Sequence, residues 1–162
     1  MITIGWREWV ALPELGVPAV KAKVDTGART SSLHTAGIEP YTQHGGPRVG
    51  FLLHPLQETR DVELWCHADV VDHRRITNSG GHADVRYVVR TLLRVGTEEW
   101  HVEISLANRE TMTFRMLLGR TALRGHALVD AGRSYLTGLR HHHAYEGRPD
   151  DRRAHDGRRP AR

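Results

Sequence analysis

Alternation of apolar and polar residues is the feature that most constrains how this chain can fold. In the segment Ala19–Asp25, Val20, Ala22 and Val24 alternate with two lysines, which is the pattern of a strand with one buried face. Comparable segments recur, and no long amphipathic helix interrupts them. The strands expected on this basis are Ile2–Leu12, Ala19–Asp25, Ser32–Ile38, Val49–Leu53, Val62–Val71, Asp84–Val95, Trp100–Leu106, Phe114–Gly119 and His126–Val129. We therefore predict an all-β domain, a barrel or a sandwich, with at most one or two short helices.

The alternating pattern ends near residue 139 and divides the chain into two parts. Residues 1–139 form the predicted folded domain, because 162 residues suit one domain and 39% of them are hydrophobic. Residues 140–162 combine the triple histidine His141–His143 with arginines, glycines and prolines. This segment buries too little apolar surface to fold. We interpret it as a disordered basic tail in preference to a weak metal site.

Charge and cysteine content narrow the classes of function. Of the net charge of +4, residues 141–162 supply six arginines against four acidic residues, so the folded part is only mildly basic. This balance requires no nucleic-acid partner and is compatible with an acidic substrate. Cys66 is the single cysteine, which excludes an intrachain disulfide. No run of about 18 apolar residues could span a membrane, and no signal peptide is apparent, so we expect a cytoplasmic location.

The run Asp25-Thr26-Gly27-Ala28 is the candidate for chemistry. An aspartic protease needs two carboxylates that share one proton, so that one activates water and the other donates to the carbonyl oxygen. Gly27 permits a close backbone approach, Thr26 can hydrogen-bond to a matching loop, and Ala28 leaves room beside the pair. In pepsin-like and retroviral folds, two apolar residues followed by Gly form a strand beneath such a turn. Met116-Leu117-Leu118-Gly119 has that form.

One chain supplies only one such turn, and two arrangements could provide the second carboxylate. Asp130, in Val129-Asp130-Ala131-Gly132, mimics the motif within the same chain. However, it lacks the apolar support, and 162 residues are too few for two lobes. We favour a homodimer in which each subunit contributes one Asp25 across a two-fold axis.

Beyond this turn, the chain resembles the bacterial family of retropepsin-like aspartic endopeptidases, which are also described as ATP-dependent zinc proteases. The segments that carry the resemblance are Gly5–Glu8, Lys21–His34, His54–Leu56, Ser79–His82, Arg86–Thr91, Asn108–Arg109, Phe114–Arg120 and Ser134–Leu136. They differ from the family pattern at Asn78 and Ala131. The resemblance implies a closed retropepsin-like β-barrel, Asp25, Thr26 and Gly27 as the catalytic turn, glutamate-rich peptides as substrates and an ATP-grasp glutamate ligase as functional partner.

A glycine-rich hairpin and several arginines are the candidate substrate-binding groups. The hairpin around Gly80, Gly81 and His82 is the predicted flap, since glycines make a lid tip mobile. Arg29 follows the catalytic turn and Arg120 follows the supporting glycine, and guanidinium groups bind carboxylates in pairs of hydrogen bonds. Together with Ala28, these residues form the predicted substrate-binding set. An ordinary exposed hairpin and surface ion pairs are the alternatives.

Two other functions stay open at this point. A non-catalytic module could use a basic groove formed by the same predicted substrate-binding residues to hold a peptide or a partner enzyme. A metalloprotease would need three protein ligands around zinc. The candidate ligands, which show no His-Glu-x-x-His spacing, are His34, His54, Cys66, His67 and His82. We expect no metal and no cofactor. No phosphate-binding Gly-Lys-Ser/Thr loop occurs, so any ATP requirement would come from a partner.

Overall fold

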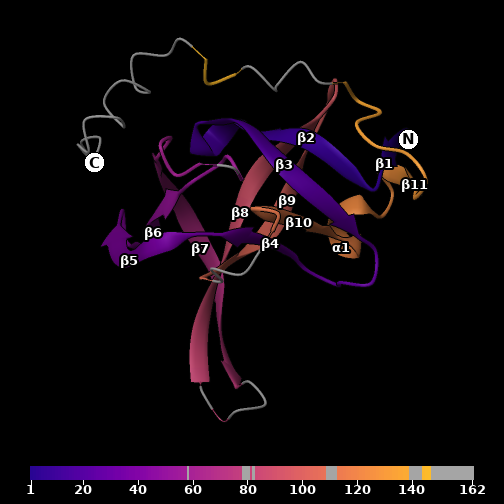
Figure 1. The fold of residues 1–162 in the computed structure, drawn as a ribbon. Coiled ribbons are helices and arrows are strands. Elements are labelled where there is room, and N and C mark those ends of the chain that lie inside the picture. The colour runs from indigo at the N-terminus through magenta and orange to yellow at the C-terminus, as the bar shows by residue number, and fades with distance from the viewer. Residues whose placement is uncertain (58, 78–80, 82, 109–112, 139–143, 147–162) are drawn as a thin grey trace.

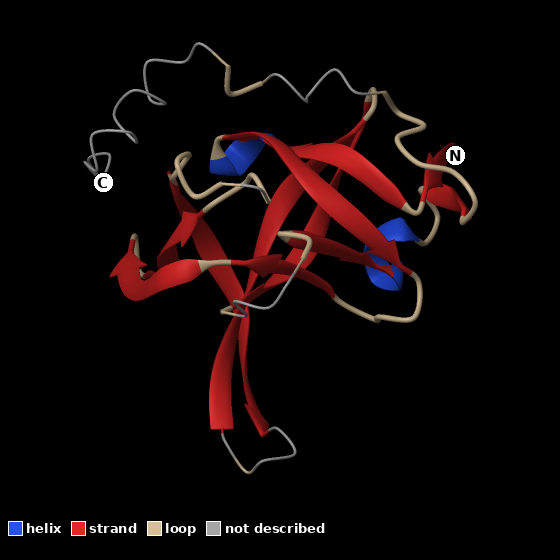
Figure 2. Cartoon of the chain, in the orientation of Figure 1, coloured by secondary structure: helices blue, strands red, loops and turns tan. Residues whose placement is uncertain are grey.

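The structure is a computed structural model and describes residues 1–57, 59–77, 81, 83–108, 113–138 and 144–146. Strands dominate it (Figures 1 and 2). They are β1 (Ile2–Gly5), β2 (Arg7–Leu12), β3 (Val17–Asp25), β4 (Ser31–His34), β5 (Ala36–Gln43), β6 (Gly46–Leu53), β7 (Leu64–Thr77), β8 (Ala83–Val95), β9 (Glu98–Ala107), β10 (Met116–Gly119) and β11 (Ala127–Asp130). The helical elements are a 3-10 turn, η1 (Pro13–Leu15), and one short helix, α1 (Arg120–Leu123).

Six of these strands close into a barrel. Their order is β2-β3-β10-β4-β9-β8, and a further pairing of β2 with β8, at Ala11 and Arg94, joins the two ends. Closure removes the free edges that an open sheet would expose. The all-β closed barrel that the sequence and the resemblance predict is therefore confirmed.

The barrel interior holds the aliphatic residues that the alternation assigned to one face. Val20, Ala22 and Val24 of β3 are buried, as are Leu33 of β4 and Leu118 of β10. The lysines of β3 point the other way. Side chains therefore fill the barrel, and any ligand of this domain must bind outside it.

Beyond the barrel, β8 continues the sheet through β7, β6 and β5. The β7–β8 hairpin is the longest pair, and Figure 1 shows it projecting well beyond the body of the molecule. The strand predicted at Ser32–Ile38 is wrong as one unit. It divides at Thr35, because β4 pairs with β9 and β10 whereas β5 turns away to pair with β6.

The segment predicted as Ile2–Leu12 also divides, at Trp6. Its first part, β1, pairs in parallel with β11 in a separate two-stranded sheet, while β2 enters the barrel. The buried carboxylate of Glu8 joins the two parts. It accepts hydrogen bonds from the Gly5 amide at 2.7 Å, the Leu136 amide at 2.9 Å, and the Thr137 amide and hydroxyl at 3.1 and 2.8 Å.

A second apolar cluster lies on the outer side of β2 and β3, where Tyr145 packs against Trp9 and Ala19. The Tyr145 hydroxyl accepts from the Ala19 amide at 3.2 Å and donates to the Ala19 carbonyl. Of the predicted tail, residues 140–162, the structure describes residues 144–146, and Tyr145 among them packs against the domain. Residues 140–143 and 147–162 lie outside the described part of the chain. Within the described part, no helix is long and apolar enough to cross a membrane.

Candidate active site

Strand β3 ends by presenting Asp25 on a tight turn. Asp25 continues the outward-facing series of Lys21 and Lys23, and its carboxylate folds back over the turn that follows. Oδ1 accepts from the Gly27 amide at 3.0 Å and from the Ala28 amide at 3.2 Å. A β-carbon at Gly27 would lie only 3.2 Å from that oxygen. The glycine therefore lets the backbone hold the carboxylate in one orientation.

Strand β10 lies directly beside this turn, as the apolar-apolar-Gly motif predicts. It runs parallel to β3, with Leu118 opposite Val24 and Gly119 opposite Asp25, and antiparallel to β4 on its other side. A β-carbon at Gly119 would lie 3.0 Å from the Ala28 carbonyl oxygen and closer still to Thr30. Any other residue at position 119 would push the turn away from β10.

The start of α1 holds the far side of the same turn. The Arg120 amide donates to the Ala28 carbonyl at 2.8 Å, and its Nη1 donates to the Gly27 carbonyl at 3.0 Å. The Thr121 amide and hydroxyl donate to the Arg29 carbonyl at 3.2 and 2.8 Å. The backbone from Gly27 to Arg29 is thereby fixed to one rigid element.

Two residues of this support were missed by the sequence reasoning. Thr121 is one, and Ser31 is the other, whose hydroxyl accepts from the Gly119 amide at 3.0 Å. Both are small hydroxyl residues at the start of an element, where such side chains commonly bond to the backbone. That position was the only signal in the sequence.

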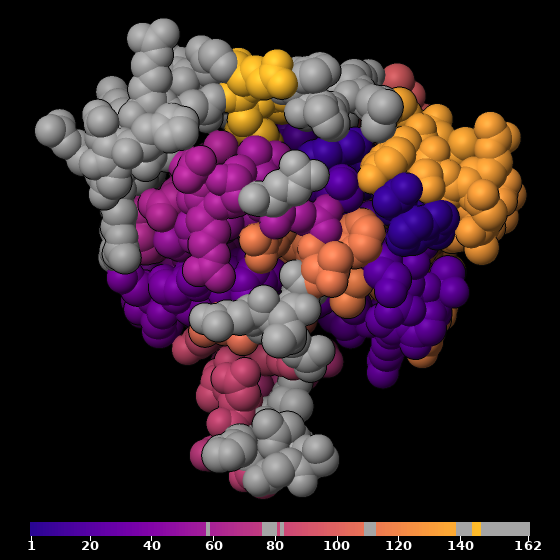
Figure 3. All heavy atoms as spheres, viewed as in Figure 1, coloured from indigo at the N-terminus to yellow at the C-terminus, as the bar shows by residue number. Residues whose placement is uncertain are grey.

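The predicted catalytic and substrate-binding residues divide into two groups. Asp25, Thr26, Gly27, Ala28, Arg29 and Arg120 come together at one turn. Thr26, Gly27 and Arg29 are exposed there, so the outer side of the turn is open. Figure 3 shows the early part of the chain, in indigo and purple, at the surface on this face of the molecule. In the predicted flap, Gly81 is exposed with a φ of 81°, while Gly80 and His82 lie outside the described residues.

Asp130, the alternative second carboxylate, occupies a similar turn in a different setting. Its Oδ1 accepts from the Gly132 amide at 3.1 Å. However, Asp130 ends β11, which pairs with β1 outside the barrel. No strand corresponding to β10 supports it in the described structure.

The candidate zinc ligands that the structure describes, His34, His54, Cys66 and His67, do not gather. Among the described residues, no three histidine, cysteine, aspartate or glutamate side chains are close enough to hold a metal ion. His67 is engaged by the Tyr41 hydroxyl at 3.1 Å, and Cys66 is buried. Burial raises the pKa of Cys66 to about 12, which disfavours the thiolate that binds metals. His82 lies outside the described residues. Within the described part of the chain, the side chains therefore do not fit the zinc that the alternative family name implies.

A closed six-stranded barrel, with an Asp-Thr-Gly turn held by an apolar-apolar-Gly strand, defines a retropepsin-like domain. The chain belongs to the family described as retropepsin-like aspartic endopeptidase RimB, whose model matches residues 3–139. The fold is also similar to the crystal structure of a Legionella pneumophila protein of unknown function. That match has a TM-score of 0.72 and 25% identity, and covers 84% of this chain and 98% of the other.

Curated relatives carry a different name. The chain is 48% identical over 135 residues to a probable alpha-L-glutamate ligase of Shewanella pealeana, covering 83% of this chain and 30% of the relative. It is 44% identical over 127 residues to a protein of the same name from Desulfotalea psychrophila, covering 78% of this chain and 27% of the relative. The chain thus spans less than a third of the length of these relatives.

Proposed function

We propose that this chain is an aspartic-type endopeptidase that forms its active site from two Asp25 residues in a homodimer. The observation that carries the proposal is the Asp25 turn, which is fixed from below by β10 and from the side by Arg120 yet open on its outer side. A second copy docked on that open side by two-fold symmetry would bring the two carboxylates together. Thr26 would then face the matching turn.

In such a pair, one carboxylate is ionised and the other protonated, since like charges at about 3 Å cannot both ionise. The ionised carboxylate takes a proton from water as the water oxygen bonds to the peptide carbonyl carbon. The protonated carboxylate gives its proton to the carbonyl oxygen. The tetrahedral intermediate then breaks its C–N bond, and the departing amine takes the proton that the first carboxylate received from water. A hydroxyl of the intermediate returns its proton to the second carboxylate as the C=O bond of the product acid forms.

For substrate and partner, we propose a glutamate-rich peptide and a glutamate ligase. The relatives named as ligases contain a segment similar to this chain within a polypeptide about three times as long. A ligase that adds glutamate and a peptidase that removes it act on the same type of chain. Arg29, exposed beside the turn, supplies positive charge for such a substrate.

The test compares Asp25→Asn with Asp130→Asn, using a glutamate-rich peptide and mass spectrometry of the products. Both asparagines can keep the hydrogen bond from the turn amide, so both variants should retain the fold. We expect Asp25→Asn to lose cleavage by at least about 10³-fold and Asp130→Asn to keep it. Sedimentation should show a dimer. Full activity of Asp25→Asn would reject the proposal, and binding without any turnover would favour the non-catalytic module.

A further inference from the structure

Arg115 is a buried arginine with no acidic partner in the described part of the chain. Its side chain is 8% exposed, its Nε makes no hydrogen bond, and none of the ion pairs there involves it. Its pKa is lowered from the ordinary value by burial and by the nearby positive charge of Arg60. A buried charge without a counter-charge is unfavourable. Such a group is expected where a ligand supplies the missing negative charge.

Arg115 lies at the same level of the sheet as two other basic residues, His34 of β4 and Arg86 of β8. The His34 amide donates to the Arg115 carbonyl at 2.7 Å, and His34 pairs with Ala107 of β9. Val88 of β8 pairs with Ser105, so Arg86 lies two residues further along, at the level of Ala107. The Nε of Arg86 is also buried without a partner. The two arginines, each with a buried Nε that has no hydrogen bond, therefore lie at the same level of the sheet, Arg115 beside His34 and Arg86 beyond Ala107.

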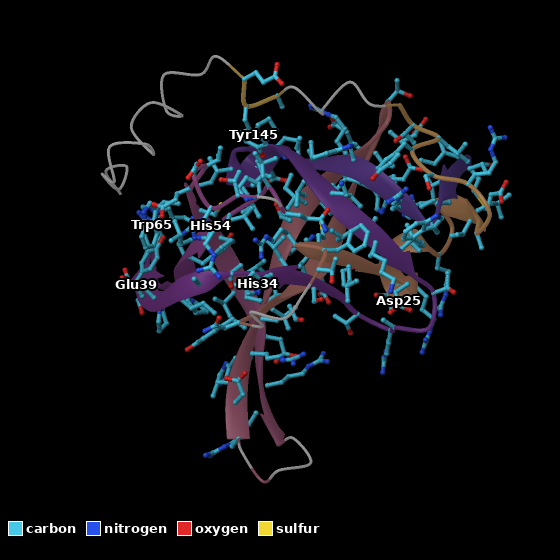
Figure 4. All side chains as sticks on the ribbon, viewed as in Figure 1. Asp25, His34, Glu39, His54, Trp65 and Tyr145 are labelled. Atoms are coloured by element: carbon cyan, nitrogen blue, oxygen red, sulfur yellow. The ribbon has the colours of Figure 1, made fainter. Side chains whose placement is uncertain are left out.

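These side chains share the outer face of the barrel with Asp25. Leu33 and Met116 fill the interior, so alternation places His34 and Arg115 on the outside. Asp25 continues the outward series of Lys21 and Lys23. Figure 4 shows Asp25 at the end of β3 and His34 at the end of β4.

The segment between β6 and β7, which includes Gln57 and Arg60, lies beside this part of the face. The Gln57 side-chain amide donates to the Thr113 carbonyl, and Arg60 lies within electrostatic range of Arg115. The Nδ1 atom of His54 is buried without a hydrogen bond. Asp61 and Glu63 belong to the same segment, but no ion pair within the described structure joins either of them to an arginine here. The positive charge at Arg115 is therefore left uncompensated.

The spacing between Arg115 and Asp25 suits an extended peptide. Gly119 is opposite Asp25, and Arg115 lies four residues before it, directly ahead of the first residue of β10. At roughly 3.3 Å per residue, the separation along the strand is about 13 Å. A peptide whose cleaved bond lies at Asp25 would place a side chain three or four residues away at Arg115.

We propose that Arg115 and Arg86, with Arg60 beside them, form a subsite that binds a carboxylate side chain of the substrate. This rests on the proposed function for its orientation toward Asp25. A carboxylate there would accept paired hydrogen bonds from the guanidinium groups. Arg115 is thus a specificity-determining residue that selects glutamate or aspartate away from the cleaved bond.

The test measures peptide binding by calorimetry to the full chain carrying Asp25→Asn, so that cleavage does not interfere. The probes are acetyl-hexaglutamyl amide, acetyl-hexaglutaminyl amide and acetyl-hexaglutamine with a free carboxyl terminus. Adding Arg115→Met should weaken binding of the glutamyl peptide by about 10–100-fold, the value of a charged hydrogen-bonded pair. Because Arg115→Met removes an unpaired buried charge, the midpoint of thermal unfolding should stay the same or rise.

Arg94→Met is the matched control, because it removes a charge from the same strand as Arg86, at a half-exposed pair with Glu99. We expect it to leave affinity within about twofold. If Arg115→Met fails to fold, the affinity of Arg86→Met for the glutamyl peptide is compared with that of Arg94→Met in its place. Unchanged affinity in the folded variants, equal binding of the glutaminyl amide, or binding only through a free carboxyl terminus would overturn the side-chain subsite.

The outcomes separate this subsite from the proposed function. Arg115-dependent binding with no cleavage by the unaltered chain would uphold the subsite and reject the peptidase. Cleavage by the unaltered chain that Arg115→Met leaves at full rate would uphold the peptidase and reject the subsite.

Discussion

Gly119 packs against the backbone of Thr30 so closely that a β-carbon on the glycine would lie 2.6 Å from the Thr30 carbonyl carbon. Backbone cannot move aside as a flexible side chain can, so Gly119→Ala must displace the Asp25 turn. We expect a loss of about 1–3 kcal/mol in the free energy of unfolding and a loss of cleavage of about 10²-fold.

Urea unfolding and peptide cleavage check this expectation together. Gly46→Ala is the control, because a β-carbon at Gly46 would meet only the Gln43 carbonyl oxygen at 3.8 Å, an ordinary contact. It should change stability by less than about 0.5 kcal/mol. Equal behaviour of the two alanine variants would contradict the packing described for Gly119.

The buried carboxylate of Glu8 accepts four hydrogen bonds, three from backbone amides and one from a hydroxyl group. Glu8→Gln keeps the shape but turns an amide NH₂ group toward those donors. We expect the free energy of unfolding to fall by about 2–4 kcal/mol. Glu14→Gln removes a half-exposed carboxylate paired with His101 and should cost less than about 1 kcal/mol. Chemical denaturation at fixed protein concentration measures both, and a harmless Glu8→Gln would refute the role given to Glu8.

The thiol of Cys66 should make stability fall at alkaline pH. Burial raises its pKa from 9.0 to about 12 in the folded chain, so between these values the unfolded chain loses a proton that the folded chain keeps. Below about pH 9 this contribution to stability is complete, and it is lost as pH rises toward 12. When the free energy of unfolding is plotted against pH over this range, the unaltered chain and Cys66→Ala should give different slopes. Parallel curves would show that Cys66 is not the cause.

Tyr145 gives a separate test of the segment beyond residue 139. Tyr145→Phe keeps the ring against Trp9 but loses the hydroxyl contacts with Ala19, for a cost of about 1 kcal/mol. Tyr145→Ala also loses the apolar packing and should cost about 3 kcal/mol or more. Chemical denaturation of both variants measures these two losses in the free energy of unfolding. If neither substitution changes stability, residues 144–146 do not pack against the domain in solution.

Local patterns in the sequence predicted most of the barrel. Alternation located β3, β8 and β9, because a strand with one buried face needs nothing beyond its own neighbours to show this period. The motif Leu117-Leu118-Gly119 likewise predicted the strand beside Asp25 correctly. Both signals lie within a few residues of the feature that they predict.

Features that depend on distant partners were not predicted. Glu8 looked like one polar residue in an alternating strand, because its hydrogen-bond donors at Leu136 and Thr137 are 128 and 129 residues away. Arg115 looked like one arginine among several, since only packing by other segments reveals its burial. The split of β4 from β5 at Thr35 arises from a change of pairing partner, which no local period records.

The parallel pairing of β1 with β11 has a consequence for how the chain reaches this fold. Ile2 is opposite Ala127, and Glu8 cannot satisfy its carboxylate until residues 136–137 are in place. Contacts of such high sequence separation form late and slow folding, because the entropy of closing the long intervening loop is lost first. During synthesis, β1 therefore cannot pair with β11 until β11 has been made. A chain interrupted before residue 136 lacks three of the four hydrogen bonds that the Glu8 carboxylate accepts in the closed domain.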